Sequence, residues 1–235
     1  MPYYHRRLPH LYKIGHPVFV TWRLHGSLPE HRPFPAERVN SGRAFDAMDR
    51  LLDCARGGPR YLAEAVLAEM VAEAIYYGAR RLGCYHLHSF VVMPNHVHLL
   101  VSPKVALDRV TCSLKGFTAR RGNEILGRTG QPFWQDESYD RLVRDAEEFR
   151  RITRYIEQNP VRAGLAASPE LYPWSSAAAG PAWRPAPHRA WAPAPLCNNN
   201  LLEDAVFWWA SEEACLCSLG CTRLLRRRRR LFLNC

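Results

Sequence analysis

The sequence lacks any hydrophobic run long enough to cross a membrane. None of its apolar stretches approaches the roughly 18 residues that a spanning helix needs. The first ten residues, MPYYHRRLPH, also lack the apolar core of a secretory signal. No internal repeat is evident. These absences exclude a membrane span and a standard secretory route, so we expect a cytoplasmic protein without a membrane partner.

Acidic residues are outnumbered in this chain. It has 32 Lys and Arg against 22 Asp and Glu, a formal net charge of +10. A surplus of this size fits a polyanionic partner, most often a nucleic acid. The 235 residues, 47% of them hydrophobic, are enough for one sizeable core with extensions.

The composition changes after residue 180. We expect one domain over residues 1–180, a Pro- and Ala-rich linker over 181–200, and a poorly ordered Cys- and Arg-rich tail over 201–235. The Cys-x-Cys-x₃-Cys pattern that starts at Cys215 does not have the usual spacing of a zinc site. The tail therefore gives no functional prediction.

Strand-like and helix-like segments alternate along the first 180 residues. Hydrophobic patterns and turn residues predict strands over 18–24, 85–93, 96–101 and 139–144, and helices over 45–54, 61–82, 107–126 and 145–159, the last ended by Pro160. This order predicts an α+β fold, with an antiparallel sheet and helices on one of its faces.

The predicted strand over 96–101 carries two histidines, His96 and His98, separated by Val97. Side chains alternate along a strand, so the two imidazoles share one face while Val97, Leu99 and Val101 point into a core. Two neutral imidazoles side by side suit a metal ion. The alternative is that both are ordinary core or surface histidines.

A second pair, His86 and His88, lies ten residues upstream on the predicted partner strand. This pair lacks the Met-Pro-Asn turn that precedes His96. We expect structural or general polar roles for it.

The predicted helix over 145–159 offers a second set of polar groups. Tyr155 and Asn159 are four residues apart, so they are neighbours along one edge of its apolar stripe. A phenol and an amide there could supply a nucleophile and a third metal ligand. Alternatively, Tyr155 is an ordinary helix-edge residue and Asn159 simply ends the helix. Tyr139 is the rival nucleophile.

Four segments together resemble a known family. They are FVTWRLHGSLP (19–29), VVMPNHVHLLV (91–101), SLKGFTARRGNEILGRTGQPFWQDESYDRLVRD (113–145) and RYIEQNPVRAGL (154–165). The His-hydrophobic-His motif is similar to that of the HUH endonucleases. Within them, the chain resembles the REP-associated tyrosine transposases over about residues 10 to 180.

This resemblance implies a ferredoxin-like antiparallel β-sheet with packed α-helices, the HUH endonuclease fold. It also implies a Mg²⁺- or Mn²⁺-dependent enzyme that nicks and rejoins single-stranded, hairpin-containing DNA through a 5′-phosphotyrosine intermediate. His96 and His98 match the metal-binding pair, and Tyr155 matches the nucleophile. Asn159 matches a Gln ligand of related transposases, and its shorter side chain reduces its reach.

Basic residues are candidates for contacts with the DNA backbone: Lys115, Arg120, Arg121 and Arg141. The first three could equally form only a solvated helix face. Three other functions stay open, namely an inactive DNA-binding protein of the same fold, a metal-dependent nuclease that uses water, and a degenerate copy. A monomer and a homodimer are both compatible with the sequence.

Overall fold

The computed structural model describes residues 3–5, 9–28, 47, 49–53 and 57–178. The predicted linker and tail lie outside these residues. Strands β1 (Tyr3–His5) and β2 (Pro9–Leu11) pair antiparallel as a small separate sheet. Among the described helices, none is long and apolar enough to cross a membrane.

The main sheet has four strands in the order β4-β5-β3-β6, and every neighbouring pair is antiparallel. The elements are β3 (Val18–Arg23), a 3₁₀ turn (Tyr61–Ala63), α2 (Ala65–Arg80), β4 (Tyr85–Val92), β5 (His96–Pro103), α3 (Leu107–Ile125), β6 (Tyr139–Leu142), α4 (Ala146–Arg162) and a second 3₁₀ turn (Pro169–Leu171). The run β3-α2-β4-β5-α3-β6 and its strand order give the ferredoxin-like topology. The α+β prediction is confirmed.

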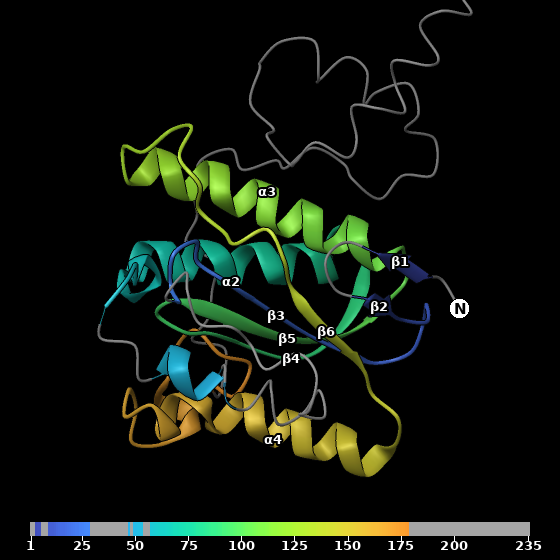
Figure 1. Ribbon diagram of the computed structural model, residues 1–235. Coiled ribbons are helices and arrows are strands. Elements are labelled where there is room, and N and C mark those ends of the chain that lie inside the picture. The colour runs from blue at the N-terminus through green and yellow to red at the C-terminus, as the bar shows by residue number, and fades with distance from the viewer. Residues whose placement is uncertain (1–2, 6–8, 29–46, 48, 54–56, 179–235) are drawn as a thin grey trace, which may run out of the picture. The chain divides into compact units, whose positions relative to one another are not determined.

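Helices cover both faces of this sheet. Figure 1 shows α2 and α3 on one side of the strands and α4 on the other. Two buried clusters match this division. Val97 and Leu99 of β5 pack with residues of α2 and α3, whereas Leu100 of β5 packs with Ile152 and Ile156 of α4. The expectation of helices on one face is therefore wrong. All of β5 is buried, so both faces of the central strands need a cover.

Helix α2 follows the predicted segment. The hydrophobic spacing there predicts an inward stripe of Leu62, Val66, Met70 and Ile75, and all of these are buried except Val66, whose exposed fraction is 54%. Leu67 and Val71 are buried as well. A 3₁₀ turn precedes the helix, and Glu64 between them has an extended backbone. The helical spacing therefore does not continue unbroken from the turn into α2.

Helix α4 begins where the sequence predicts and ends later. The Oδ1 atom of Asp145 accepts the backbone N–H of Glu148 at 2.7 Å, which caps the first turn. Pro160 lies inside the helix, which continues to Arg162. Pro160 has no N–H to donate to the carbonyl of Ile156, but the N–H of Ala163 donates to the carbonyl of Asn159 at 3.0 Å. The N–H of Leu165 still donates to the carbonyl of Pro160 at 2.8 Å.

The outer edge of β4 is partly closed by a later segment of the chain. The N–H of Val92 donates to the carbonyl of Trp174, and the N–H of Ser176 donates to the carbonyl of Phe90, both at 2.9 Å. The Ser176 hydroxyl also accepts the N–H of Phe90 at 3.0 Å. This half of the edge strand thus has its backbone groups paired.

Candidate active site

His96 and His98 lie next to each other in the centre of the sheet. Both side chains are fully buried, and their Nε2 atoms are 3.1 Å apart. They share the face that α4 covers, while Val97 between them faces α2 and α3. The predicted alternation along this strand is confirmed.

A carboxylate that the sequence analysis missed completes the group. Asp49, on the helical segment over residues 49–53, places Oδ1 at 3.1 Å from His98 Nε2 and 3.5 Å from His96 Nε2. One ligand atom of each of these residues lies within 4.8 Å of the others. The sequence contained a feature that could have indicated Asp49. It is three residues before the apolar Leu52, so the predicted helix has an acid on the stripe that faces inward.

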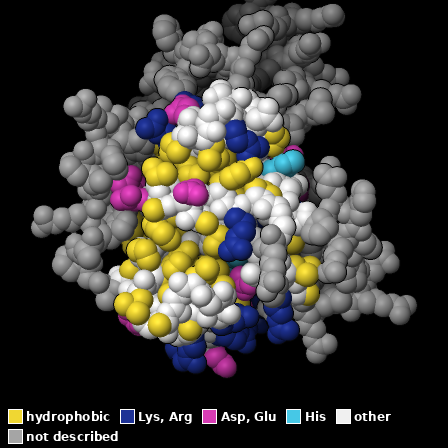
Figure 2. Space-filling model, turned by 90° about the vertical axis from the view of Figure 1, so that its left-hand side faces the viewer, with side chains coloured by type: hydrophobic (Ala, Val, Ile, Leu, Met, Phe, Trp, Pro, Cys, Tyr) yellow, Lys and Arg dark blue, Asp and Glu magenta, His cyan; other side chains and the backbone are white. Residues whose placement is uncertain are grey.

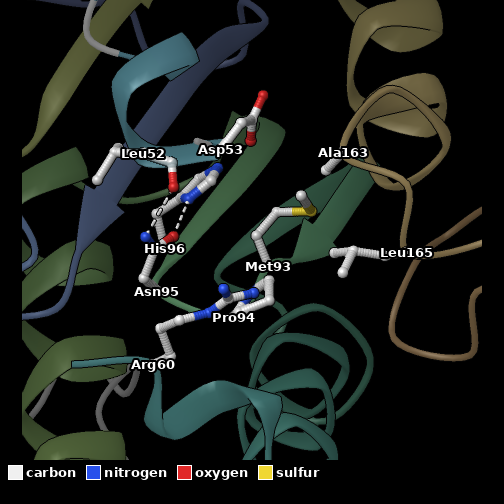
Figure 3. A pocket seen from close by; sticks show the side chains of 9 residues that line it. All are labelled: Leu52, Asp53, Arg60, Met93, Pro94, Asn95, His96, Ala163 and Leu165. Carbon is white, nitrogen blue, oxygen red and sulfur yellow. Dashed lines mark hydrogen bonds between the residues drawn. The ribbon is translucent and has the colours of Figure 1, made fainter. Parts of the chain in front are cut away.

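The neighbouring Asn95 determines which nitrogen of His96 carries the proton. The Nδ2 atom of Asn95 donates to the carbonyl of Leu52 at 2.9 Å, so its Oδ1 atom must face His96 Nδ1, at 2.7 Å. Figure 3 shows both hydrogen bonds. Because Oδ1 only accepts, His96 is protonated on Nδ1 and its Nε2 lone pair points to Asp49. Asn95 also ties the Asp49 segment to the histidine strand.

His98 is held from the adjacent strand. Its Nδ1 atom lies 2.8 Å from the Thr21 hydroxyl on β3, and this contact is buried. The ring stacks on Phe19, with centroids 5.6 Å apart. Partners on Nδ1 orient both imidazoles, which is the usual arrangement around metal-binding histidines.

The protonation states suit a cation. Burial, reinforced by His98, lowers the pKa of His96 to about 3, so its imidazole is neutral. Burial alone would raise the pKa of Asp49, but its interactions with His98 and His96 outweigh this and lower the pKa, so the side chain is a carboxylate. Asp49 Oδ1 is buried and has no hydrogen-bond partner. An unpaired carboxylate oxygen facing imidazole nitrogens fits a divalent metal ion.

Helix α4 brings Tyr155 to the same group. Its hydroxyl donates a hydrogen bond to Asp49 Oδ2, the oxygen opposite the one nearest the histidines. The phenol ring meets His98 edge-on, with centroids 5.6 Å apart, and also contacts Phe19. The guanidinium of Arg162 covers the ring at 5.1 Å from its centroid. Tyr139 lies on β6, edge-on to Phe19.

Asn159 also reaches the site. The side chain is fully buried, with Nδ2 at 3.1 Å from His98 Nε2 and 3.4 Å from Asp49 Oδ2. Its Oδ1 atom is buried without a hydrogen-bond partner. A half-turn of the amide would direct this oxygen at the space between Asp49 and the histidines. The structure thus brings together all four residues that the sequence singled out for the chemistry.

The expected DNA contacts lie elsewhere. Lys115, Arg120 and Arg121 are on α3, across the sheet from the histidines. Lys115 donates to the carbonyls of Gln135 and Asp136, both at 2.7 Å, and Arg121 pairs with Glu124. On β6, Arg141 pairs with the buried Glu148 at 2.6 Å. Lys115, Arg121 and Arg141 therefore make internal contacts in this structure.

Comparison with known proteins gives a family match. Residues 60–159 match the family described as "Transposase IS200 like". This segment contains His96, His98, Tyr155 and Asn159, while Asp49 precedes it. No curated protein matches the chain.

Two solved structures are similar to the chain. One is a REP-associated tyrosine transposase bound to a REP hairpin, with 19% identity, 75% of this chain and 82% of that chain covered, and a TM-score of 0.45. The other is a crystal structure of a protein from Deinococcus radiodurans R1 assigned as a transposase, with 20% identity, 66% and 96% covered, and a TM-score of 0.36.

Transposases are enzymes that act on DNA. The family match spans α2, β4, β5, α3, β6 and most of α4, and therefore most of the sheet and helices that support the site. The segment over 60–159, with its histidine pair and its helix-borne tyrosine, matches the IS200-like transposase family.

Proposed function

We propose that this protein is a metal-dependent nickase and strand transferase that acts on single-stranded, hairpin-containing DNA through a 5′-phosphotyrosine intermediate. One observation carries the proposal. Asp49 connects the two parts of the site, because Oδ1 faces the histidines while Oδ2 accepts the hydrogen bond of the Tyr155 hydroxyl. The hairpin preference rests on the resemblance of the four sequence segments to the REP-associated transposases.

The residues have separate roles in this reaction. The Tyr155 oxygen attacks phosphorus, a bond forms between the two, and the bond from phosphorus to the 3′ oxygen breaks. Asp49 is placed to accept the phenol proton, since its carboxylate already accepts that hydrogen bond. Solvent protonates the released 3′ oxygen. The phosphodiester energy is kept in the tyrosine ester, which permits rejoining.

His96, His98 and Asp49, with the oxygen of Asn159, would hold Mg²⁺ or Mn²⁺. When bound, such an ion supplies Lewis-acid polarisation of the scissile phosphate and orients it for in-line attack. The carboxylate and amide oxygens in this set suit both Mg²⁺ and Mn²⁺. The burial of the histidines excludes water from one side of this position.

The decisive experiment is to trap the covalent intermediate. The purified chain is incubated with a hairpin-containing oligonucleotide and Mg²⁺ or Mn²⁺, and an SDS-resistant protein–DNA adduct is measured. We expect an adduct with the wild type and with Tyr139→Phe, and none with Tyr155→Phe. An adduct that survives Tyr155→Phe would refute this nucleophile. Cleavage without an adduct would indicate a water-using nuclease, and binding alone an inactive DNA-binding protein or a degenerate copy.

Asp49→Asn tests the second half of the site. This change keeps the size of the side chain but removes its charge and its proton acceptor. We expect adduct formation and Mn²⁺ binding, the latter measured by calorimetry, both to fall by more than about 100-fold, because even residues outside the ligand shell are worth 10- to 100-fold. Unchanged Mn²⁺ binding would show that Asp49 serves only Tyr155.

A further inference from the structure

Helix α4 carries several exposed arginines. Figure 2, which keeps the vertical direction of Figure 1, shows Lys and Arg side chains gathered at the lower edge of the molecule, at the level of α4. The exposed arginines of this helix are Arg150, Arg151, Arg154 and Arg162. These side chains differ in their position relative to Tyr155 and in their internal contacts.

Arg162 is the one that lies against the proposed nucleophile. It follows Tyr155 by seven residues, so the two side chains leave the helix only about 20° apart. The guanidinium carbon is 5.1 Å from the centroid of the phenol ring. A cation that stacks on a ring face leaves the N–H groups at its rim directed outward, toward ligands beside the ring.

Three other arginines are held by one acid, Glu148, in the first turn of α4. Glu148 has an exposed fraction of only 2% and pairs with Arg141, Arg144 and Arg151 at 2.6, 2.9 and 3.5 Å. Among the described residues, Arg162 has no hydrogen bond or ion pair of this kind. Its positive charge acts electrostatically on Asp53, which is on the same segment as Asp49. Arg162 therefore has donors available for a ligand.

From these observations we infer that Arg162 is a further catalytic residue, whose guanidinium binds a non-bridging oxygen of the scissile phosphate. The inference rests on the proposed function, because the phosphate is the one that Tyr155 attacks. A planar fork of donors matches two phosphate oxygens. Negative charge on those oxygens is redistributed during the transfer, so a fixed guanidinium stabilises the transition state.

The test compares Arg162→Gln with Arg154→Gln. Both variants lose one positive charge from an exposed position on α4, but Arg154 leaves the helix about 100° from Tyr155. We expect Arg162→Gln to slow single-turnover adduct formation by about 100- to 1,000-fold, the usual cost of a transition-state donor. Arg154→Gln should change this rate by less than about threefold. Arg162→Lys, which keeps the charge without the fork, should be intermediate.

Two measurements separate a catalytic contact from a structural or general electrostatic one. The affinity for the oligonucleotide, measured by fluorescence anisotropy in a Tyr155→Phe background, should fall less than about tenfold with Arg162→Gln. Replacing one non-bridging oxygen of the scissile phosphate by sulfur should slow adduct formation by the wild type. For one of the two phosphorothioate diastereomers, this slowing should be smaller in Arg162→Gln than in the wild type.

The outcomes distinguish this inference from the proposed function. A wild type that forms no adduct refutes the proposed function and the inference together. A wild type that forms the adduct, with an equal rate for Arg162→Gln, refutes only the role of Arg162. Equal losses for Arg162→Gln and Arg154→Gln would also refute it, because they would reflect net charge alone.

Discussion

Two His-x-His pairs lie on adjacent strands of this sheet, and only one of them forms a site. His96 and His98 are on the central strand β5, fully buried, with Nε2 atoms 3.1 Å apart. His86 and His88 are on the edge strand β4, and both are exposed. The same spacing in the sequence therefore gives different chemistry in different parts of a sheet.

The backbone explains much of this difference. The pairing of β4 with β5 shifts between Leu87 and Ser89, so His88 falls at a bulge. A bulge interrupts the alternation of side chains, and the regular pleat of β5 keeps it. The central pair also faces Asp49, an acid from a separate segment. Among the described residues, no acid forms such a group with the edge pair. Burial and a third ligand convert two imidazoles into a candidate metal centre.

The largest expected effect separates the two pairs directly. His98→Ala should abolish detectable Mn²⁺ binding and adduct formation, a loss of more than about 100-fold, because it removes a ligand atom from the centre of the site. His88→Ala should leave both within about twofold. Calorimetric titration with Mn²⁺ and the adduct assay measure these changes. Equal losses in the two variants would contradict our distinction between the pairs.

An intermediate effect is expected at Asn95, which has no counterpart at the edge pair. Asn95→Ala removes the acceptor that keeps the proton on His96 Nδ1 and the donor that holds Leu52. We expect Mn²⁺ affinity to fall by about 10- to 100-fold. The control is Asn123→Ala, which removes another buried amide that donates to the Gln131 carbonyl at 2.7 Å.

Both asparagine variants should lower the free energy of unfolding, since Asn95→Ala loses two buried hydrogen bonds and Asn123→Ala loses one that is partly buried, each worth about 1 kcal/mol. Only Asn95→Ala should change Mn²⁺ affinity. A loss of Mn²⁺ affinity in Asn123→Ala of similar size would show that general destabilisation, and not the orientation of His96, is responsible.

The smallest expected effect compares two hydroxyl groups at the same distance from an imidazole. Thr21 lies 2.8 Å from His98 Nδ1, and Ser102 lies 2.8 Å from His88 Nε2. Thr21→Val should lower Mn²⁺ affinity by about tenfold, because it frees the buried ring of His98. Ser102→Ala should leave Mn²⁺ affinity unchanged and cost about 1 kcal/mol or less in chemical denaturation. A metal effect for Ser102→Ala would place the edge pair in the site after all.

The parts of the site that could be predicted depend on local periodicity. The His96–His98 alternation and the Tyr155–Asn159 spacing follow from the geometry of one strand and one helix. Asp49 comes from a segment some 50 residues before the histidines, and nothing local shows where such a segment docks. Its place on an apolar stripe was the available signal.

The errors in the fold have a similar origin. Pro160 was expected to end α4. The position of a proline in the sequence does not show that the backbone N–H groups after it still reach carbonyl acceptors, as those of Ala163 and Leu165 do. The rotation of α2, which leaves Val66 exposed, depends on the turn before it. The second helical layer was missed because an alternating pattern does not show that both faces of a strand are covered.

The closed half of the β4 edge has a consequence for assembly. An open edge strand can join another chain into a larger sheet, and natural proteins commonly obstruct such edges. Here the segment with Trp174 and Ser176 occupies the backbone groups of Phe90 and Val92. A second copy that extends the sheet through this half must first displace that segment, at a cost of about 1 kcal/mol for each hydrogen bond. The chain's own backbone therefore covers part of the outer edge of β4, the strand that lies next to the histidine-bearing strand β5.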